Sequence, residues 1–391
     1  MKLFTYLLAL PLALAAPILE HRDKATVIPD RWIAVLNNDI ESTQLESVLS
    51  KVTSHLQGTK PDNIWDFDGF RGFSFGAKGG LVETLASAIS ELAFIEPDVE
   101  VTTQEFVAQK NPPWGLARLS HREIDNSSYT YDSSAGEGIV AYSIDTGVYA
   151  EHADFEGRAT MAKSFVQGEE TDGNGHGTHT AGTFGGAKYG VAKKVTIVGV
   201  KVLSDEGSGY ASGIISGIEW AVNDMEKRGK ARKAVANMSF GGLRTSNANN
   251  AAVKAATDAG MFVAVAAGNS NLLAELYTPA SEPSACTVAA SDASDQFASF
   301  SNFGPSVDVV APGVDVESAF IGGPHETAVL SGTSMAAPHV AGLGAYLLAL
   351  EGERSPQDLC KRIRDLSTEG AVSGLQTLLT PNRLAFNGAK E

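Results

Sequence analysis

Cysteine, aromatic residues and basic charge are all scarce in this sequence of 391 residues. Only two cysteines are present, so a fold held together mainly by disulfides is excluded. Lysine and arginine number 30 against 46 acidic residues, and the net charge of −16 argues against nucleic acid or an anionic membrane as partner. Aromatic residues make up 8% of the chain, whereas 40 glycines favour tight turns and close backbone packing.

Long hydrophobic runs are rare too, and the one that stands out lies at the N-terminus. The segment MKLFTYLLALPLALAAP carries one lysine, an apolar stretch and an Ala13-Leu14-Ala15 site of the kind that signal peptidase cleaves. It is shorter than the ~20 apolar residues of a membrane span, although a membrane anchor remains an alternative. We therefore expect a signal peptide over residues 1–15, cleaved after Ala15 or Ala16, and a secreted, extracellular protein.

The rest of the chain has the composition of a globular protein with more than one unit, at 43% hydrophobic and 19% charged residues. Residues 16–106 are predicted to form a small α/β unit. Strand-like patterns at 31–37, 69–76 and 93–102 alternate there with helix-like patterns at 41–56 and 81–92. The Asn-Pro-Pro of AQKNPPWG then marks a linker.

Residues 107–391 alternate apolar runs with helical patterns. Strands are expected at 138–144, 195–203, 234–240, 261–267, 286–290 and 307–312, and helices at 211–229 and 247–260. Continuous apolar strands separated by helices predict an α/β fold, with a doubly wound, mostly parallel sheet and helices on both faces. In such sheets the functional residues gather just beyond the carboxyl ends of the strands.

Residues with catalytic chemistry follow several of these strands. Asp145 ends the first strand, and His176 and His179 stand in DGNGHGTHTAG. Ser334 precedes an apolar run in GTSMAAPH, and Asn269 follows the strand at 261–267. An imidazole that takes the serine proton, a carboxylate that fixes the imidazole, and an amide donor for the oxyanion are the parts of an acyl-transfer site.

Each of these residues also has a purely structural interpretation. Asp145 and Asn269 would serve equally well in turns. His176, between two glycines, would simply begin a helix of small residues. Ser334 would be the residue that caps the following helix, because a serine side chain at that position accepts a hydrogen bond from a free backbone N–H.

The motifs as a set resemble those of a known family. SIDTGV, DGNGHGTHTAG, NMSFGG, AAGN and GTSMAAPHVAG are similar to the signature blocks of subtilisin-like serine proteases, and their order, Asp then His then Ser, is that of subtilisin. PPWGLARLS, GVKVL and TPASEPSACTVAASD resemble the proteinase K-like branch of secreted fungal enzymes. The resemblance runs from Val107 to about Phe386.

The resemblance implies a role for each candidate. Asp145 orients the base, His176 is the general base and acid, and Ser334 is the nucleophile. Asn269 and the backbone N–H of Ser334 form the oxyanion hole, while His179 is structural.

Further residues are implied to bind substrate. The walls of the pocket for the residue before the scissile bond would be Ser239, Phe240, Gly241, Ala266, Ala267 and Gly268. The edge formed by Gly207, Ser208 and Gly209 would pair with the substrate backbone. These small, uncharged walls imply broad specificity, with an apolar or aromatic residue preferred.

The family also implies a structural Ca²⁺ and a disulfide, but no catalytic cofactor. The carbonyls of Pro283 and Ala285 and the carboxylate of Asp308 match a calcium site, although Asp308 would also suit a turn. The aspartate of a second family site has no match. Cys286 and Cys360 match a family disulfide, as expected for a secreted protein, with two buried free thiols as the alternative.

The leading unit resembles the family's ferredoxin-like inhibitory propeptide. The match places the cleavage between Phe106 and Val107, which gives a propeptide at 16–106 and a catalytic domain at 107–391. We expect a monomer that acts on proteins and peptides. Asn126 is a candidate glycosylation site, whereas Asn237 is expected to be buried and bare. A vacuolar protease and a catalytically silent, peptide-binding relative are the alternatives, and the natural substrate is not indicated.

Overall fold

The computed structural model describes residues 15–19, 27–99, 106–124, 127–243 and 246–389. The chain divides into two compact units, Met1–Thr103 and Gln104–Glu391. Nearly all of the predicted signal peptide, and Asn126, lie outside the described residues. Phe106 and Val107, on either side of the predicted cleavage, lie in the first strand of the second unit. That cleavage stays a prediction.

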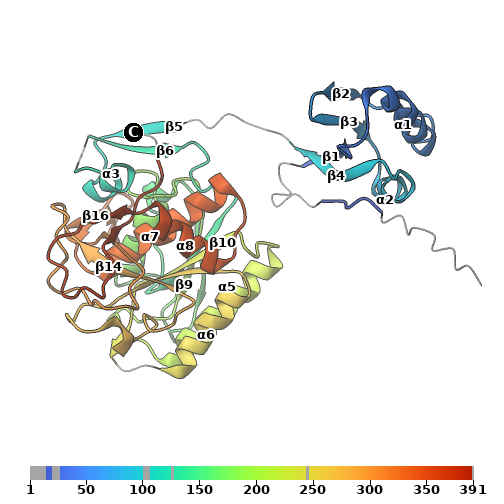
Figure 1. Cartoon of the computed structure of the whole chain (residues 1–391). Helices are drawn as coiled ribbons and strands as arrows, with labels where there is room; N and C mark the ends of the chain where they lie inside the picture. Colours follow the sequence, from blue (N-terminus) through green and yellow to red (C-terminus); the bar gives the residue numbers. More distant parts are fainter. Residues whose placement is uncertain (1–14, 20–26, 100–105, 125–126, 244–245, 390–391) are drawn as a thin grey trace, which may run out of the picture. The chain divides into compact units, whose positions relative to one another are not determined.

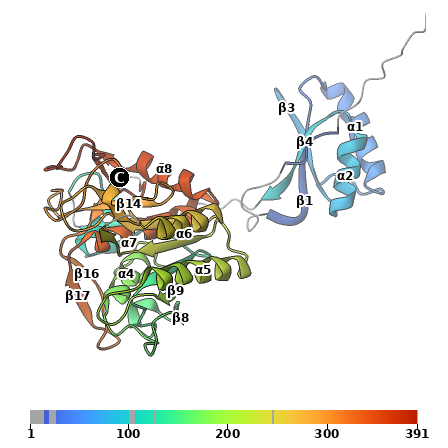
Figure 2. The ribbon, with the colours of Figure 1, turned by 90° about the horizontal axis from the view of Figure 1, so that it is seen from below.

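The first unit is an antiparallel sheet with two helices. Its elements are β1 (Val27–Leu36), α1 (Ser42–His55), β2 (Asn63–Phe67), β3 (Phe70–Gly76), α2 (Gly79–Ala88) and β4 (Leu92–Val99). The sheet order β2-β3-β1-β4 and the β-α-β-β-α-β succession are those of the ferredoxin-like arrangement. Figure 2 shows both helices along one face of the sheet. Phe73 and Phe75 are fully buried in the core that the helices cover.

The second unit is larger and of mixed type. Its helices are α3 (Trp114–Ser120), α4 (His176–Gly185), α5 (Ala211–Lys227), α6 (Asn247–Asp258), α7 (Thr333–Glu351) and α8 (Pro356–Leu366). Its sheet strands are β7 (Val140–Asp145), β8 (Ala159–Ser164), β9 (Thr196–Lys201), β10 (Ala234–Met238), β12 (Phe262–Ala266), β14 (Cys286–Ser291), β15 (Val309–Pro312), β18 (Thr368–Glu369) and β19 (Arg383–Leu384). Three further two-stranded antiparallel sheets pair β5 (Phe106–Lys110) with β6 (Ser128–Asp132), β11 (Gly242–Leu243) with β13 (Tyr277–Thr278), and β16 (Val316–Ala319) with β17 (Thr327–Leu330).

The central sheet confirms the predicted doubly wound architecture. Its strand order is β18-β19-β15-β14-β12-β10-β7-β9-β8, and only the β18–β19 pair is antiparallel. After β7 the chain adds β8 and β9 on one side, and it then crosses to the other side to add β10. β7 is therefore the strand at which the winding reverses, and ligands of such sheets bind beyond the carboxyl end of that strand.

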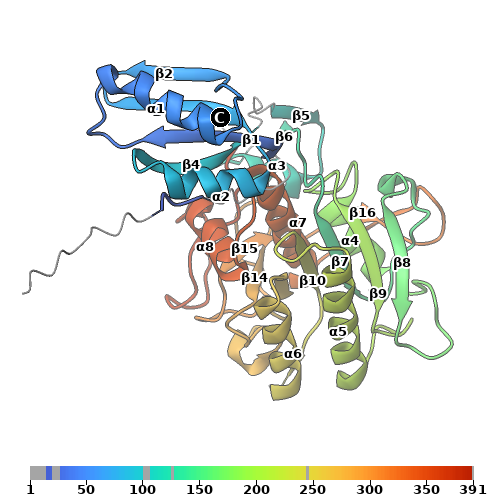
Figure 3. The ribbon, with the colours of Figure 1, turned by 90° about the vertical axis from the view of Figure 1, so that its right-hand side faces the viewer.

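Helices cover both faces of this sheet, as the apolar strands predict. Val140, Tyr142 and Ile144 of β7 pack in the cluster beneath α5 and α6. Ala141, one residue out of phase, packs in the cluster beneath α4, α7 and α8. The alternation follows from the two-residue period of a strand. α5 and α6 lie side by side along their face (Figures 1 and 3).

α7 is the central helix of the second unit. By length and composition it is the one described helix apolar enough to cross a membrane, but 83% of its most apolar window is buried inside the protein. It packs against α4, α8 and strands β10, β12, β14 and β15. This burial identifies α7 as the core helix of the unit and not as a membrane span. The neighbouring α8 is bonded to β14 by the disulfide Cys286–Cys360, which confirms the predicted pairing and rules out two free thiols.

Candidate active site

Asp145 and His176 meet at the carboxyl end of β7. Asp145 is the last residue of that strand and is completely buried, whereas His176 is the first residue of α4 and its side chain is 27% exposed. His176 Nδ1 lies 2.7 Å from Asp145 Oδ1, which also accepts the backbone N–H of Thr146 at 2.7 Å. Asp145 Oδ2 is buried without a hydrogen-bond partner among the described residues. The carboxylate is thus held against one edge of the imidazole.

The loop before His176 is fixed by a second carboxylate, that of Asp172. Its Oδ1 accepts hydrogen bonds from Thr146 Oγ1 at 2.8 Å and from the backbone N–H of Gly175 at 2.8 Å. Its Oδ2 accepts both the N–H and the hydroxyl of Thr178, at 2.9 and 2.5 Å. Gly175 has φ +97°, a conformation that favours glycine, and a β-carbon there would collide with the ring of Phe320. A hydrogen-bonded turn therefore fixes the position of His176.

Two carboxylates act on the titration of His176. Burial alone would lower the pKa of the imidazole, but the charge and hydrogen bond of Asp145, with the charge of Asp172, outweigh it. The pKa of His176 therefore lies above its ordinary value. The neutral imidazole, which is the form that can accept a proton, becomes dominant only as the pH rises through this raised pKa.

Ser334 is not a helix cap, so the capping interpretation is wrong. α7 begins one residue earlier, at Thr333, and Gly332 occupies the N-cap position. The Ser334 hydroxyl instead donates to the carbonyl of Ser239 at 2.9 Å, while the Ser239 hydroxyl donates to the carbonyl of Ser334 at 2.7 Å. The half-buried hydroxyl thus stands in the first turn of α7, a helix that packs against α4. The positive end of the helix dipole is directed to this position.

Asn269 is held by the residue next to Ser334. Its Oδ1 accepts both the backbone N–H and the hydroxyl of Thr333, each at 2.8 Å, and the same hydroxyl accepts the N–H of Gly268 at 3.1 Å. With Oδ1 occupied, the Nδ2 group of this exposed side chain remains as the donor. A β-carbon on Gly332 would lie 3.3 Å from Nδ2, so the amide donor faces the start of α7.

The predicted substrate-binding residues differ in exposure. Ser239, Ala266 and Ala267 are buried at the ends of β10 and β12, whereas Gly241, Gly207, Ser208 and Gly209 are exposed. Phe240 and Gly268 are half-buried. The backbone of 207–209 therefore faces outward, and the strand ends supply a small-residue surface below it. Asn237 is buried in β10, as expected, and the absence of a glycan there stays a prediction.

His179 and His339 are buried histidines outside the Asp145–His176 pair. His179 Nε2 lies 3.0 Å from the carbonyl of Val316 and 3.2 Å from that of Ala328, and so helps to attach the β16–β17 pair to α4. His339 lies within α7, with Nδ1 2.8 Å from the carbonyl of Met335. Burial lowers the pKa of each of these histidines to about 4.

We expect the buried histidines to weaken the fold in acid. Both are neutral in the folded protein, whereas in the unfolded chain they take up protons near pH 6.5. The stability they contribute is fully present above pH 6.5 and is lost as the pH falls towards 4, by roughly 3 kcal/mol per histidine at most. Urea unfolding of Ser334→Ala protein at pH 7.5, 5.5 and 4.5 measures this slope, and adding His339→Gln should flatten it. His325→Gln, at an exposed histidine, is the control, and equal slopes in all three proteins would contradict the assignment.

The predicted calcium ligands raise a question of fit at Asp308. Oδ2 accepts the backbone N–H of Thr287 at 2.9 Å, and Oδ1 pairs with the guanidinium of Arg364 at 2.9 Å. Arg364 stands one helical turn after Cys360, so the disulfide that binds α8 to β14 also brings this arginine to Asp308. The one carboxylate of the predicted ligand set, which includes Pro283 and Ala285, already has a cationic partner. As arranged, these residues do not fit a Ca²⁺ ion.

The calcium prediction can be tested directly against this arginine. If Arg364 supplies the positive charge, removing calcium with EDTA should leave the melting temperature of Ser334→Ala protein unchanged. Arg364→Gln should lower stability by about 1 kcal/mol, the upper range for a partly exposed ion pair, and should make the melting temperature respond to added Ca²⁺. Lys361→Gln, which removes an exposed ion pair of the same helix, is the control. A large loss of stability in EDTA with Arg364 in place would restore the calcium site.

Several residues that fix the site escaped the sequence analysis. Thr333 donates hydrogen bonds to Asn269, and Thr146 joins Asp172 to the helix that begins at His176. Asp172 accepts hydrogen bonds from the turn that precedes this helix. Each lies within a quoted motif, directly beside a predicted residue or up to four positions from one. The available signal was their position in GTS, DTG and DGNGHG, but their partners are distant in sequence and only the fold reveals them.

A doubly wound sheet with Asp, His and Ser in this chain order at the reversal of its winding is the arrangement of a subtilisin-type serine hydrolase. Comparison with known proteins agrees. Residues 136–383 match the subtilase family, Peptidase S8. The chain is 44% identical over its whole length to the whole of a cuticle-degrading protease of Metarhizium anisopliae. It is 47% identical to the subtilisin-like serine protease AsES of Sarocladium strictum, over 99% of both chains.

Solved structures give the same result. The crystal structure of a cold-adapted subtilisin-like serine proteinase matches 72% of this chain and 100% of its own, with 42% identity and a TM-score of 0.67. This chain therefore belongs to the subtilase family, and it is a serine endopeptidase.

Proposed function

We propose that the protein cleaves peptide bonds with Ser334 as nucleophile, His176 as general base and acid, and Asp145 as the group that orients the base. The observation that carries the proposal is the 2.7 Å contact between His176 Nδ1 and Asp145 Oδ1. It fixes the imidazole so that Nε2 is the nitrogen free to accept a proton. The first turn of the adjoining helix α7 supplies the hydroxyl.

The reaction follows from these groups. The Ser334 hydroxyl turns from the carbonyl of Ser239 to His176, gives its proton to Nε2, and its oxygen bonds to the scissile carbonyl carbon. The oxyanion that forms accepts hydrogen bonds from Asn269 Nδ2 and from the backbone N–H of Ser334. The C–N bond then breaks, and His176 gives the proton to the leaving amine. Water repeats the sequence on the acyl-enzyme, which releases the acid and restores the Ser334 hydroxyl.

Substrate preference follows from the small, uncharged residues at the strand ends. Ala266 and Ala267 are buried beside Ser239, and no charged side chain belongs to this predicted wall. An apolar or aromatic side chain before the scissile bond loses least on leaving water for such a surface. The exposed backbone at 207–209 would pair with an extended peptide through the groups that its own turn does not use, and the amide groups of the peptide are the same in every sequence. The expected outcome is broad specificity.

The leading unit extends the proposal to a zymogen. Residues 16–106 would inhibit the enzyme as a propeptide until it cuts its own chain after Phe106, an aromatic residue that suits the proposed pocket. The signal sequence predicted for residues 1–15 supports export, and the expected product is a secreted monomer. The alternative is a vacuolar enzyme of the same fold. N-terminal sequencing and fractionation of the medium and the vacuole separate these cases, because only the proposal gives Val107 as the first residue of a protein in the medium.

The activity itself is tested by digestion of a denatured protein and mass spectrometry of the products. The proposal predicts cuts mainly after Phe, Tyr and Leu, and complete inhibition by a serine-directed sulfonyl fluoride. An inert purified protein would favour the catalytically silent, peptide-binding alternative. Cuts mainly after lysine or arginine would contradict the proposed pocket.

A further inference from the structure

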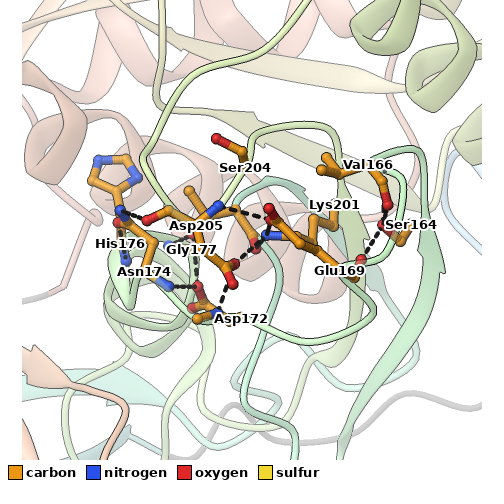
Figure 4. Close-up of polar contacts among 12 residues, drawn as sticks. Ser164, Val166, Glu169, Asp172, Asn174, His176, Gly177, Lys201, Ser204 and Asp205 are labelled. Carbon is orange, nitrogen blue, oxygen red and sulfur yellow. Dashed lines mark hydrogen bonds and ion pairs between the residues drawn. The ribbon is translucent and has the colours of Figure 1, made fainter.

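Lys201 ends β9 with its ammonium group fully buried (Figure 4). Nζ donates to the carbonyl of Thr146 at 2.8 Å, pairs with Asp205 Oδ1 at 2.7 Å and pairs with Glu169 Oε2 at 3.1 Å. An ammonium has three donors, and this one has three acceptors from three different segments of the chain. Burying such a charge is costly, and an apolar side chain of similar volume often stabilises a fold as well or better. This cost points to a role beyond packing.

The contact with Asp205 leads towards His176. Asp205 Oδ1 accepts the backbone N–H of Gly173 at 3.1 Å, and the Asp205 carbonyl accepts the side-chain amide of Asn174 at 2.8 Å. Asn174 Oδ1 in turn accepts the backbone N–H of His176 at 3.2 Å. Figure 4 shows this connection from Lys201 through Asp205 to the residue that begins α4. The turn that presents the imidazole is thus anchored to the segment after β9.

The contact with Thr146 leads towards Asp145. The carbonyl of Thr146 accepts from Lys201, while the N–H of the same residue donates to Asp145 Oδ1. The backbone that follows the carboxylate is therefore held from both sides.

The same lysine is also paired with the segment that precedes the predicted substrate-binding edge. The Asp205 backbone N–H donates to Glu169 Oε2 at 2.8 Å, so both acidic partners of Lys201 are joined to each other as well. The chain then turns sharply, with hydrogen bonds from Ser204 N–H to the Ser208 carbonyl at 2.7 Å and from Gly207 N–H to the Ser204 carbonyl at 2.8 Å. The hydrogen bond to Lys201 is the main reason that the pKa of Asp205 lies below its ordinary value, although Asp205 is 40% exposed. The exposed 207–209 backbone is thus part of this anchored turn or directly follows it.

We propose that Lys201 is a positioning residue that fixes the substrate-binding edge 207–209 relative to the Asp145–His176 pair, so that an extended peptide lies in register with the catalytic groups. The inference rests on the proposed function. It assigns to Glu169 and Asp205 the task of holding the lysine between the two loops. If the lysine served only the stability of the sheet, its replacement would slow the hydrolysis of short and long substrates alike.

The test compares two substrates in full-length protein that has matured normally. Lys201→Met keeps the length and the apolar stem, removes the ammonium and leaves two carboxylates facing each other. For a four-residue peptide anilide, which reaches the edge, kcat/KM should fall at least about tenfold more than for a single-residue ester, which does not. Most of this extra loss should appear as a higher KM. Lys254→Met, which removes an exposed ion pair on α6, should leave kcat/KM unchanged for both substrates.

Asp205→Asn keeps the shape of the anchor should Lys201→Met fail to fold. Its amide oxygen can still accept a hydrogen bond from Gly173, but the ion pair with Lys201 is lost. The loss of kcat/KM should therefore again be larger for the peptide than for the ester, by a smaller factor. Equal losses for ester and peptide in both variants, or no loss, would overturn the positioning role. Failure of the unsubstituted protein to hydrolyse either substrate would overturn the proposed function instead, so the two failures are distinguishable.

Discussion

Ser334→Ala should lower kcat for peptide hydrolysis by about a million-fold, the loss measured when the catalytic serine of subtilisin itself is removed. The alcohol that we propose as the nucleophile is gone, and what activity remains would come from binding and the oxyanion donors. Since the same serine would cut the chain, the precursor should accumulate with residues up to Phe106 attached. Peptide assays on purified protein and N-terminal sequencing measure both effects.

Ser299→Ala, at an exposed serine, is the matched control and should keep full activity and normal maturation. His176→Ala should behave like Ser334→Ala, because an unactivated hydroxyl is a poor nucleophile. A Ser334→Ala protein that retains a tenth of the activity, or that matures in a host without proteases, would contradict the assignment of the nucleophile.

Asp145→Asn should reduce kcat by about ten-thousand-fold, the size found for this change in other Ser-His-Asp proteases and close to the value for removing the aspartate of subtilisin itself. The amide cannot hold His176 Nδ1 in its protonated form as the carboxylate does at 2.7 Å. The variant also loses the charge that raises the pKa of His176. The residual activity should therefore reach half its maximum at a lower pH than in the unsubstituted protein.

Asp172→Asn separates the two carboxylates near His176. Asp172 contributes charge and holds the turn, but its oxygens bond to Thr146, Gly175 and Thr178 and not to the imidazole. The loss of kcat should be far smaller than for Asp145→Asn, with a pH shift in the same direction. Equal losses in the two variants, or a shift to higher pH, would contradict the roles given to them. Kinetics across pH 5–10 provides both readouts.

Much of the architecture follows from apolar patterning. The six runs predicted as strands of the second unit correspond to β7, β9, β10, β12, β14 and β15, because strands buried on both faces must be apolar throughout. The strands that were missed are short or lie at edges. β2, for example, is NIWDF with only Trp65 half-buried, so neither alternation nor an apolar run identifies it.

The site can be predicted only in part from the sequence. The positions of Asp145 and His176 follow from strand and helix boundaries, since parallel strands bring their carboxyl ends to one edge. The residues that hold them do not. Lys201 resembles any strand-end lysine until the fold brings Glu169 to it across 32 residues. Arg364 meets Asp308 only once the fold has packed α8 beside β14, where the disulfide joins them.

The single most direct measurement is covalent labelling of the active protein with a fluorophosphonate, followed by mass spectrometry of the digested product. If the carboxylate, the imidazole and the hydroxyl act together, one equivalent should attach to the peptide containing Ser334, and His176→Ala should abolish the reaction. Stoichiometric label on another residue, or undiminished labelling without His176, would contradict the account.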